Sequence, residues 1–142
     1  MEWLNYTDPV LGFSLTYPNL YTVLKEPASY AEIAPNLLGR FRLLEPSLAE
    51  SAFAELEPPK FSLEVYSNAE KLSLTAWLDK NSRNGDSDSI QIDGIKCSKV
   101  TQKTLMAPNQ FIYCIQGDKI YQFIPLGLYA EQILASFKFG AQ

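Results

Sequence analysis

Apolar and polar residues alternate in three segments of the first half of the chain, residues 11–17, 38–44 and 61–66. Alternation with a period of two is typical of a strand that buries one face of a sheet. We therefore predict three strands here. Between the first two strands we expect a short turn of helix at residues 19–23, followed by irregular structure at residues 26–35.

Apolar residues at intervals of three and four predict three helices. Ser47 and Glu50 form the pattern of a capping box, in which each side chain satisfies the free backbone N–H of the other residue. Ser73 is expected to be the N-cap of the second helix. The three predicted helices cover residues 47–56, 74–80 and 128–137.

Two late segments, residues 111–116 and 119–125, flank a Gly-Asp turn signal and predict a hairpin. Two further strands are predicted before them, at residues 90–92 and 95–104. Both hairpin segments are almost continuously apolar, and a strand that is apolar on both faces must be covered on both faces. The predicted fold is therefore α+β: an α/β/α sandwich in which helices cover both faces of one mostly antiparallel sheet, with residues 1–142 forming a single domain.

Charge and hydropathy argue against two classes of partner. The chain has 12 Lys and Arg residues against 16 Asp and Glu residues, which gives a net charge of -4. Nucleic-acid binding depends on basic side chains that neutralise phosphates, so we expect no nucleic-acid partner. We also expect a protein that does not span a membrane, because no segment is apolar over the length that a bilayer requires.

Catalytic and metal-binding motifs are absent from the sequence. There is no histidine, which removes the commonest general base and the commonest metal ligand. Nucleophile motifs and glycine-rich phosphate loops are also missing. We therefore expect no catalytic residue, no metal site and no cofactor. An enzyme that uses carboxylates alone is the remaining catalytic alternative, and the sequence supplies no facing pair of acids for it.

The two cysteines, Cys97 and Cys114, fall in strands that we expect to face each other. Their register is not determined by the sequence, so a disulfide and two separate thiols are both compatible with it. We favour two buried thiols that act as small apolar side chains, because nothing in the sequence indicates an oxidising compartment.

Aromatic residues crowd the N-terminal part of the chain. Phe13 and Tyr17 fit the inward side of the first predicted strand, so they are expected in the core. Tyr21 and Tyr30 lie in weakly structured segments and are the candidates for an exposed recognition surface. Together with Phe53 they are also the expected lining of a cleft between sheet and helix, if the chain is a carrier of a small apolar ligand.

One short segment at each end of the chain is similar to a known family. Tyr6 followed by Gly-Phe-Ser-Leu-Thr-Tyr-Pro at residues 12–18 resembles the opening strand of the PsbP family, the extrinsic proteins of photosystem II. Residues 133–139 resemble its last helix and tail, and the order of elements between them also matches. That family has an α/β/α sandwich fold, shared with a nuclear Ran-GTPase-binding protein and with bacterial envelope proteins.

The chain also departs from this family. The tryptophan that usually follows the Tyr-Pro pair is missing, and Tyr21 is the nearest aromatic residue. The family's metal sites often use histidine, so no metal or binding residue is transferred. The resemblance implies a non-enzymatic accessory or assembly domain that binds a protein partner, in a photosynthetic or envelope complex.

The sequence leaves the compartment open between two alternatives. The N-terminus has no basic segment followed by an apolar core, so we expect a cytoplasmic protein if Met1 is the native start. The resemblance implies instead a mature exported domain in a lumen, a periplasm or an envelope.

Overall fold

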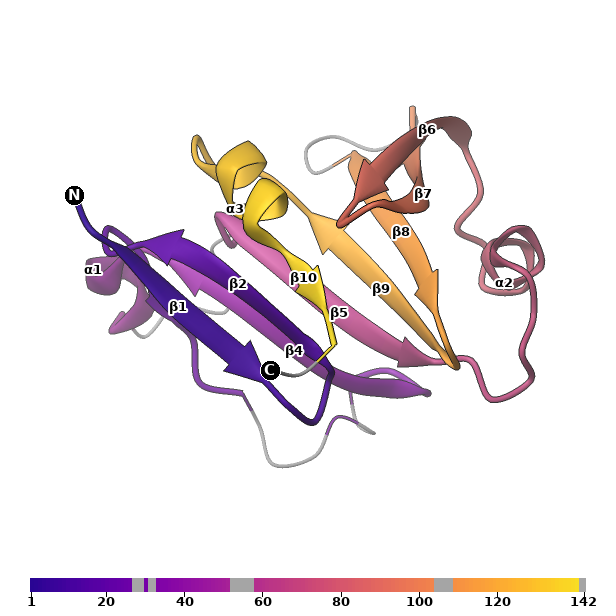
Figure 1. The fold of residues 1–142 in the computed structure, drawn as a ribbon, viewed down its shortest axis with the longest axis horizontal. Coiled ribbons are helices and arrows are strands. Elements are labelled where there is room, and N and C mark those ends of the chain that lie inside the picture. The colour runs from indigo at the N-terminus through magenta and orange to yellow at the C-terminus, as the bar shows by residue number, and fades with distance from the viewer. Residues whose placement is uncertain (27–29, 31–32, 52–57, 104–108, 141–142) are drawn as a thin grey trace.

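The computed structural model describes residues 1–26, 30, 33–51, 58–103 and 109–140. Its strands and helices follow one another along the chain as shown in Figure 1. The strands are β1 (Trp3–Asp8), β2 (Phe13–Pro18), β3 (Thr22–Val23), β4 (Leu37–Leu44), β5 (Phe61–Ser67), β6 (Asp86–Ile92), β7 (Ile95–Thr101), β8 (Gln110–Gln116), β9 (Lys119–Ile124) and β10 (Lys138–Phe139). The helices are α1 (Pro46–Ala49), α2 (Leu74–Lys80) and α3 (Ala130–Ser136).

The strands form two antiparallel sheets. The larger sheet has seven strands in the order β3-β4-β5-β9-β8-β7-β6, and the smaller has three in the order β1-β2-β10. The predicted late hairpin is confirmed: β8 and β9 pair antiparallel, with Cys114 opposite Tyr121. Gly117 in the turn has a positive φ of 61°, which glycine adopts without steric cost. The expected antiparallel architecture is therefore present.

The first face of the large sheet packs against the small sheet and α3, which lie in front of it in Figure 1. Phe137, next to the end of α3, stacks on Phe13 of β2 with 5.5 Å between ring centroids. It also lies edge-on to Phe123 of β9 at 4.9 Å. Phe13 in turn lies edge-on to Phe41 of β4 at 5.9 Å. The main core is therefore an aromatic layer between two sheets and a helix.

The second face of the large sheet is covered only in part. α2 places Trp77 and Leu78 in a cluster with Tyr66 of β5 and Tyr113 of β8. This helix has 7 residues, and it lies at one end of the sheet in Figure 1. The rest of the face is left to other side chains and loops. The predicted sandwich with helices over both faces is therefore wrong.

β1 explains most of this difference. The strand pairs with β2 along its whole length, from Trp3 opposite Pro18 to Asp8 opposite Phe13. The resulting small sheet occupies the layer that we expected helices to fill. Helix α1 does not compensate, because it spans only Pro46–Ala49.

Other predicted elements differ from the structure in their ends or their type. The short helix expected at residues 19–23 is wrong, because Thr22–Val23 is strand β3. The capping box is also wrong, since Glu45 is the N-cap of α1 and no side chain caps that helix. The end of that predicted helix, residues 52–56, lies outside the described residues. The strand predicted at residues 90–92 begins earlier, as β6 (Asp86–Ile92).

Both ends of α2 are capped by local hydrogen bonds. The predicted N-cap is confirmed, because the Ser73 hydroxyl oxygen accepts from the backbone N–H of Ala76 at 3.2 Å. At the other end, Ser82 N–H donates to the Asp79 carbonyl at 3.2 Å, and Arg83 N–H donates to the Leu78 carbonyl at 2.9 Å. This pair of bonds is a Schellman motif. It fixes the direction in which the chain leaves the helix, and so the position of Arg83.

Replacing Ser82 with glycine is expected to raise the free energy of unfolding by about 1 kcal/mol. Ser82 has a φ of 55°, a left-handed conformation that strains every side chain with a Cβ atom. Urea unfolding curves of Ser82→Gly and the parent protein measure the difference. Ser87→Gly, in the extended strand β6, is the matched control and should give no stabilisation. An unchanged or lowered stability in Ser82→Gly would contradict this account of the helix end.

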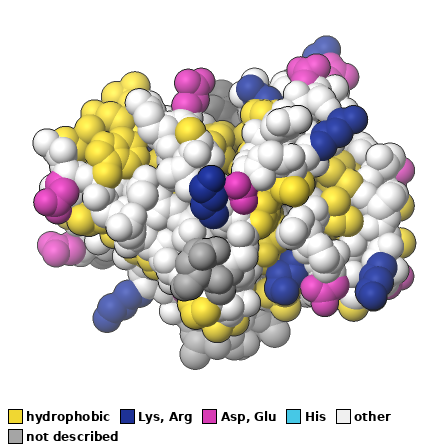
Figure 2. All heavy atoms as spheres, viewed as in Figure 1, with side chains coloured by type: hydrophobic (Ala, Val, Ile, Leu, Met, Phe, Trp, Pro, Cys, Tyr) yellow, Lys and Arg dark blue, Asp and Glu magenta, His cyan; other side chains and the backbone are white. Residues whose placement is uncertain are grey.

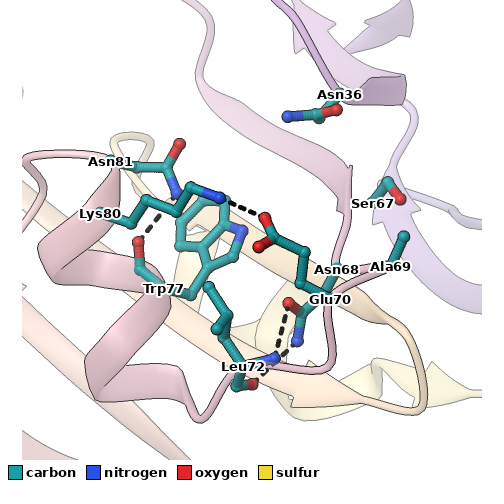
Figure 3. Close-up of a pocket in the computed structure, with 9 residues that line it drawn as sticks. All are labelled: Asn36, Ser67, Asn68, Ala69, Glu70, Leu72, Trp77, Lys80 and Asn81. Carbon is teal, nitrogen blue, oxygen red and sulfur yellow. Dashed lines mark hydrogen bonds and ion pairs between the residues drawn. The ribbon is translucent and has the colours of Figure 1, made fainter.

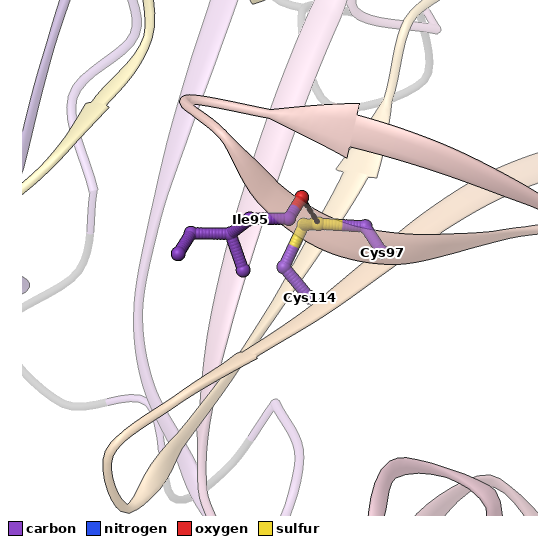
Figure 4. Close-up of a disulfide and its surroundings, with 3 residues drawn as sticks. All are labelled: Ile95, Cys97 and Cys114. Atoms are coloured by element: carbon purple, nitrogen blue, oxygen red, sulfur yellow. Dashed lines mark hydrogen bonds between the residues drawn. A yellow bond between two sulfur atoms is a disulfide. The ribbon is translucent and has the colours of Figure 1, made fainter.

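Cys97 and Cys114 form a disulfide that joins β7 to β8 (Figure 4). The pairing of Ser98 with Tyr113 places the two cysteines directly opposite each other, with 4.6 Å between their Cα atoms. That separation is typical of a cross-strand pair without backbone hydrogen bonds. The preferred interpretation of two separate thiols is therefore wrong, because the register that decides between the alternatives is set by the whole sheet.

Candidate functional site

The three residues predicted for recognition do not form one site. Tyr21 is 8% exposed and lies edge-on to Tyr129 at 6.2 Å, so the expectation that it is exposed is wrong. It belongs to the core on the first face, whereas half-buried Tyr30 packs against the cluster on the second face. Phe53 lies outside the described residues. The two described tyrosines therefore do not line a common cleft.

Tyr30 lines a hollow of about 330 Å³ beside β4. Glu26, which also lines it, accepts from Nε of Arg40 at 2.5 Å and from Nε of Arg42 at 2.6 Å. Burial raises the pKa of Tyr30, so its hydroxyl stays protonated at neutral pH. Because the carboxylate is already shared by two guanidinium groups, this hollow is an ion-paired edge of the sheet rather than a ligand site.

An apolar patch lies at the end of the molecule where β1 begins and where the chain enters α3. Figure 2 shows hydrophobic side chains gathered over this end. Trp3 lies edge-on to Tyr129, with 6.1 Å between ring centroids. Leu128 precedes Tyr129 in the chain and is exposed, and so are Leu126 and Leu20, whose neighbour Tyr21 contacts the Tyr129 ring. We call this surface, made of Trp3, Leu20, Leu126, Leu128 and Tyr129, the apolar end.

The loop that carries part of the apolar end is held in place. Gly127 N–H donates to the carbonyl of Lys60 at 2.6 Å. A Cβ atom at Gly127 would lie 2.8 Å from that oxygen and 2.9 Å from the hydroxyl of Tyr21, so only glycine fits. Leu128 follows this anchored residue and is 91% exposed. The sequence prediction placed Leu128 inside a helix, but α3 begins at Ala130.

A hydrogen-bonded network of four side chains crosses the second face near the end of α2. Nη1 of Arg83 donates to Oε1 of Gln122 at 2.6 Å, and Nε2 of Gln122 donates to Oε1 of Glu64 at 2.7 Å. The hydroxyl of Tyr66 donates to the same oxygen of Glu64 at 3.0 Å and accepts from Nη2 of Arg83 at 3.3 Å. The four side chains therefore form a closed ring of hydrogen bonds, which holds the guanidinium and the carboxylate in fixed positions.

This network borders a hollow of about 440 Å³, which we call the network hollow. Burial raises the pKa of Tyr113 to about 12 even though Arg83 lies close, so its hydroxyl stays protonated. The sequence analysis missed this site, because its residues come from separate strands and from the end of α2. The residues that line it are Glu64, Ser82, Arg83, Gln102, Phe111, Tyr113, Gln122 and Ile124.

A smaller hollow of about 200 Å³ lies beside α2 (Figure 3). Lys80 and Glu70 form an ion pair across it. The side chain of Asn68 is hydrogen-bonded to both the N–H and the carbonyl of Leu72, at 3.1 and 3.0 Å. The amide of Asn81 donates to the carbonyl of Trp77 at 2.8 Å. These polar groups hold the chain around α2, so we assign this hollow a structural role.

Among the described residues, no group of three or more acidic or cysteine side chains is arranged to hold a metal ion. No helix in the described parts of the chain combines the length and the hydropathy needed to cross a membrane. Our candidate surfaces are the apolar end and the network hollow.

Comparison with known proteins gives a likeness of fold. No protein-family model and no curated protein matches the sequence. A crystal structure from Bacteroides thetaiotaomicron VPI-5482 is similar with a TM-score of 0.58 and 12% identity, over 100% of this chain. The match covers 50% of that chain, so our protein spans half the length of this neighbour.

The solution structure of cyanobacterial PsbP (CyanoP) from Synechocystis sp. PCC 6803 is also similar. It has a TM-score of 0.50 and 13% identity, and the match covers 96% of this chain and 92% of that one. At this identity the likeness concerns the fold alone. The chain therefore has a distantly PsbP-like fold, which supports the resemblance predicted from its two ends.

Proposed function

We propose that this chain is a non-enzymatic protein-binding or assembly domain with a PsbP-like fold, and that it docks through its apolar end. The observation that carries the proposal is Leu128, a leucine that is 91% exposed on an anchored loop. Leu128 belongs to a group of exposed and half-buried apolar side chains, and a patch of this kind indicates an interaction surface where a single exposed residue does not. Burying one such side chain is worth roughly 1.5–3 kcal/mol, which becomes available only when another surface covers it.

The surroundings of Leu128 fit a docking surface. Tyr129 and Trp3 are half-buried, their rings contact each other edge-on, and Tyr129 directly follows the exposed Leu128. Aromatic residues with an apolar body and one polar atom are enriched in protein interfaces. We therefore expect a protein partner with an apolar surface of its own. The resemblance to extrinsic photosystem proteins directs the search for this partner to photosynthetic and envelope complexes.

Replacing Leu128 with aspartate is expected to weaken partner binding at least about tenfold, because it places an unpaired charge in the centre of the contact. The side chain is exposed, so the fold should tolerate the change. The measurement is an affinity purification of the tagged protein from native extract, with the partner quantified against the bait.

Val10→Asp is the matched control for this experiment. Val10 is 82% exposed in the turn between β1 and β2, at the opposite end of that hairpin from Trp3. The parent and the control should retain the same stoichiometric partner, and Leu128→Asp should lose it. A parent protein that retains no stoichiometric partner would overturn the proposal, as would equal retention by both variants.

A further inference from the structure

The network hollow contains two opposite charges that do not form an ion pair with each other. Glu64 and Arg83 both line it, and the amide of Gln122 lies between them. Because a single amide bridges the two groups, the carboxylate and the guanidinium border the same hollow. The separation between them is about the width of one hydrogen-bonded amide. A ligand that meets both groups must carry a donor and an acceptor at a matching short separation.

Both charged groups keep hydrogen-bonding capacity. Among the described residues, both hydrogen bonds to the Glu64 carboxylate end on Oε1, so Oε2 is available as an acceptor. A guanidinium has five N–H donors, and Arg83 uses one on Gln122 and one on Tyr66. The hydroxyl of Tyr113 is also close, and the guanidinium lies over the rings of Tyr66 and Trp77, with 4.6 and 5.4 Å from Cζ to the ring centroids. The hollow can therefore both accept from and donate to a ligand.

The network hollow also has an apolar part, where Phe111 and Ile124 lie two residues along β8 and β9 from Tyr113 and Gln122. Phe111 and Ile124 are half-buried, and Phe111 lies 6.5 Å from Tyr113 between ring centroids. The volume of about 440 Å³ is in the range of small-molecule sites. The site thus combines one negative group, one positive group and an apolar platform.

We propose that the network hollow binds a free α-amino acid with an apolar side chain. Its ammonium group donates to Oε2 of Glu64, and its carboxylate accepts from the guanidinium of Arg83. Its side chain lies against Phe111, Tyr113 and Ile124. A zwitterion fits this site better than a neutral amide, because it meets each full charge with the opposite charge. The site is separate from the apolar end, so the two proposals can fail independently.

Isothermal titration calorimetry with L-phenylalanine and two analogues tests this assignment. N-acetyl-L-phenylalanine lacks the ammonium group, and L-phenylalaninamide lacks the carboxylate. We expect phenylalanine to bind with a Kd below about 1 mM and each analogue to bind about tenfold more weakly or worse. No binding of phenylalanine at about 10 mM would overturn the proposal. Equal binding of the amide would also overturn it, because it would show that the hollow does not recognise the carboxylate.

The variant Glu64→Gln separates ligand binding from structure. Glutamine keeps an oxygen that accepts from Tyr66 and Gln122, so the network is retained while the charge is lost. The preference for phenylalanine over its N-acetyl form should disappear in this variant. Glu70→Gln, in the ion pair with Lys80 outside the network hollow, should leave the preference unchanged.

A second measurement uses the parent protein, so it does not depend on whether a variant folds. In the parent protein, NMR titration with phenylalanine should shift the side-chain amide resonances of Gln122, which lines the hollow. Shifts confined to other parts of the molecule would contradict the assigned site.

Discussion

Replacing Phe137 with alanine should lower the free energy of unfolding by about 4 kcal/mol, the largest loss that we expect from a single substitution. Its side chain has 0% exposure. The ring stacks on Phe13 of the small sheet and lies edge-on to Phe123 of the large sheet. Alanine would therefore open a cavity at the point where α3 and both sheets meet.

Chemical denaturation of Phe137→Ala and the parent protein measures this loss. Leu128→Ala is the matched control, because it removes a comparable apolar group from a position that is 91% exposed. The control should change the free energy of unfolding by less than about 0.5 kcal/mol. A loss of less than about 1 kcal/mol in Phe137→Ala would mean that the two sheets do not share the core described above.

Removing the disulfide should lower the free energy of unfolding by about 3 kcal/mol. Cys97 and Cys114 are separated by 17 residues, so the cross-link closes a loop that the unfolded chain must otherwise close at a cost in entropy. The double variant Cys97→Ala/Cys114→Ala removes the bond, and urea unfolding without reductant measures the difference.

The reductant dithiothreitol provides an independent control for the disulfide. It should destabilise the parent protein by a similar amount and leave the double variant unaffected, because alanine cannot be reduced. Equal stability of the parent protein with and without reductant, under conditions where mass spectrometry shows free thiols, would contradict the predicted role of this bond. A loss in the double variant alone would indicate a packing defect rather than a lost cross-link.

Local patterns in the sequence predict much of the large sheet. Alternation predicts β2, β4 and β5, and the apolar runs around Gly117 predict the β8–β9 hairpin. Ser73 predicts the start of α2. These features depend on neighbouring residues, which explains why a single sequence is sufficient for them.

Features that depend on distant parts of the chain were not predicted correctly. Trp3–Asp8 becomes a strand because β2 pairs with it, and this pairing replaces the expected helical layer with a second sheet. The disulfide likewise depends on a register that places Ser98 opposite Tyr113. Coverage of both faces of β8 was inferred correctly from its apolar residues, but apolarity does not say whether a helix or a sheet covers a face.

The candidate sites were the least predictable part. Tyr21 was expected at the surface but is in the core. The network hollow brings together Glu64, Arg83 and Gln122 from three separate segments. The sequence does carry one signal for this face that the prediction did not use, a polar residue within an apolar strand at Gln122. The partners of such a residue become visible only with the sheet order.

Photo-cross-linking from position 128 tests the docking proposal most directly. p-Benzoylphenylalanine would replace Leu128 in one protein and Val10 in a second, and both positions are exposed. Val10 lies in the turn of the β1–β2 hairpin, whereas Leu128 precedes Tyr129, which contacts Trp3 at the other end of that hairpin. Illumination in the native host should yield one adduct of discrete mass from position 128 and none from position 10. The absence of an adduct at position 128, or the same adduct from both positions, would contradict docking through the apolar end.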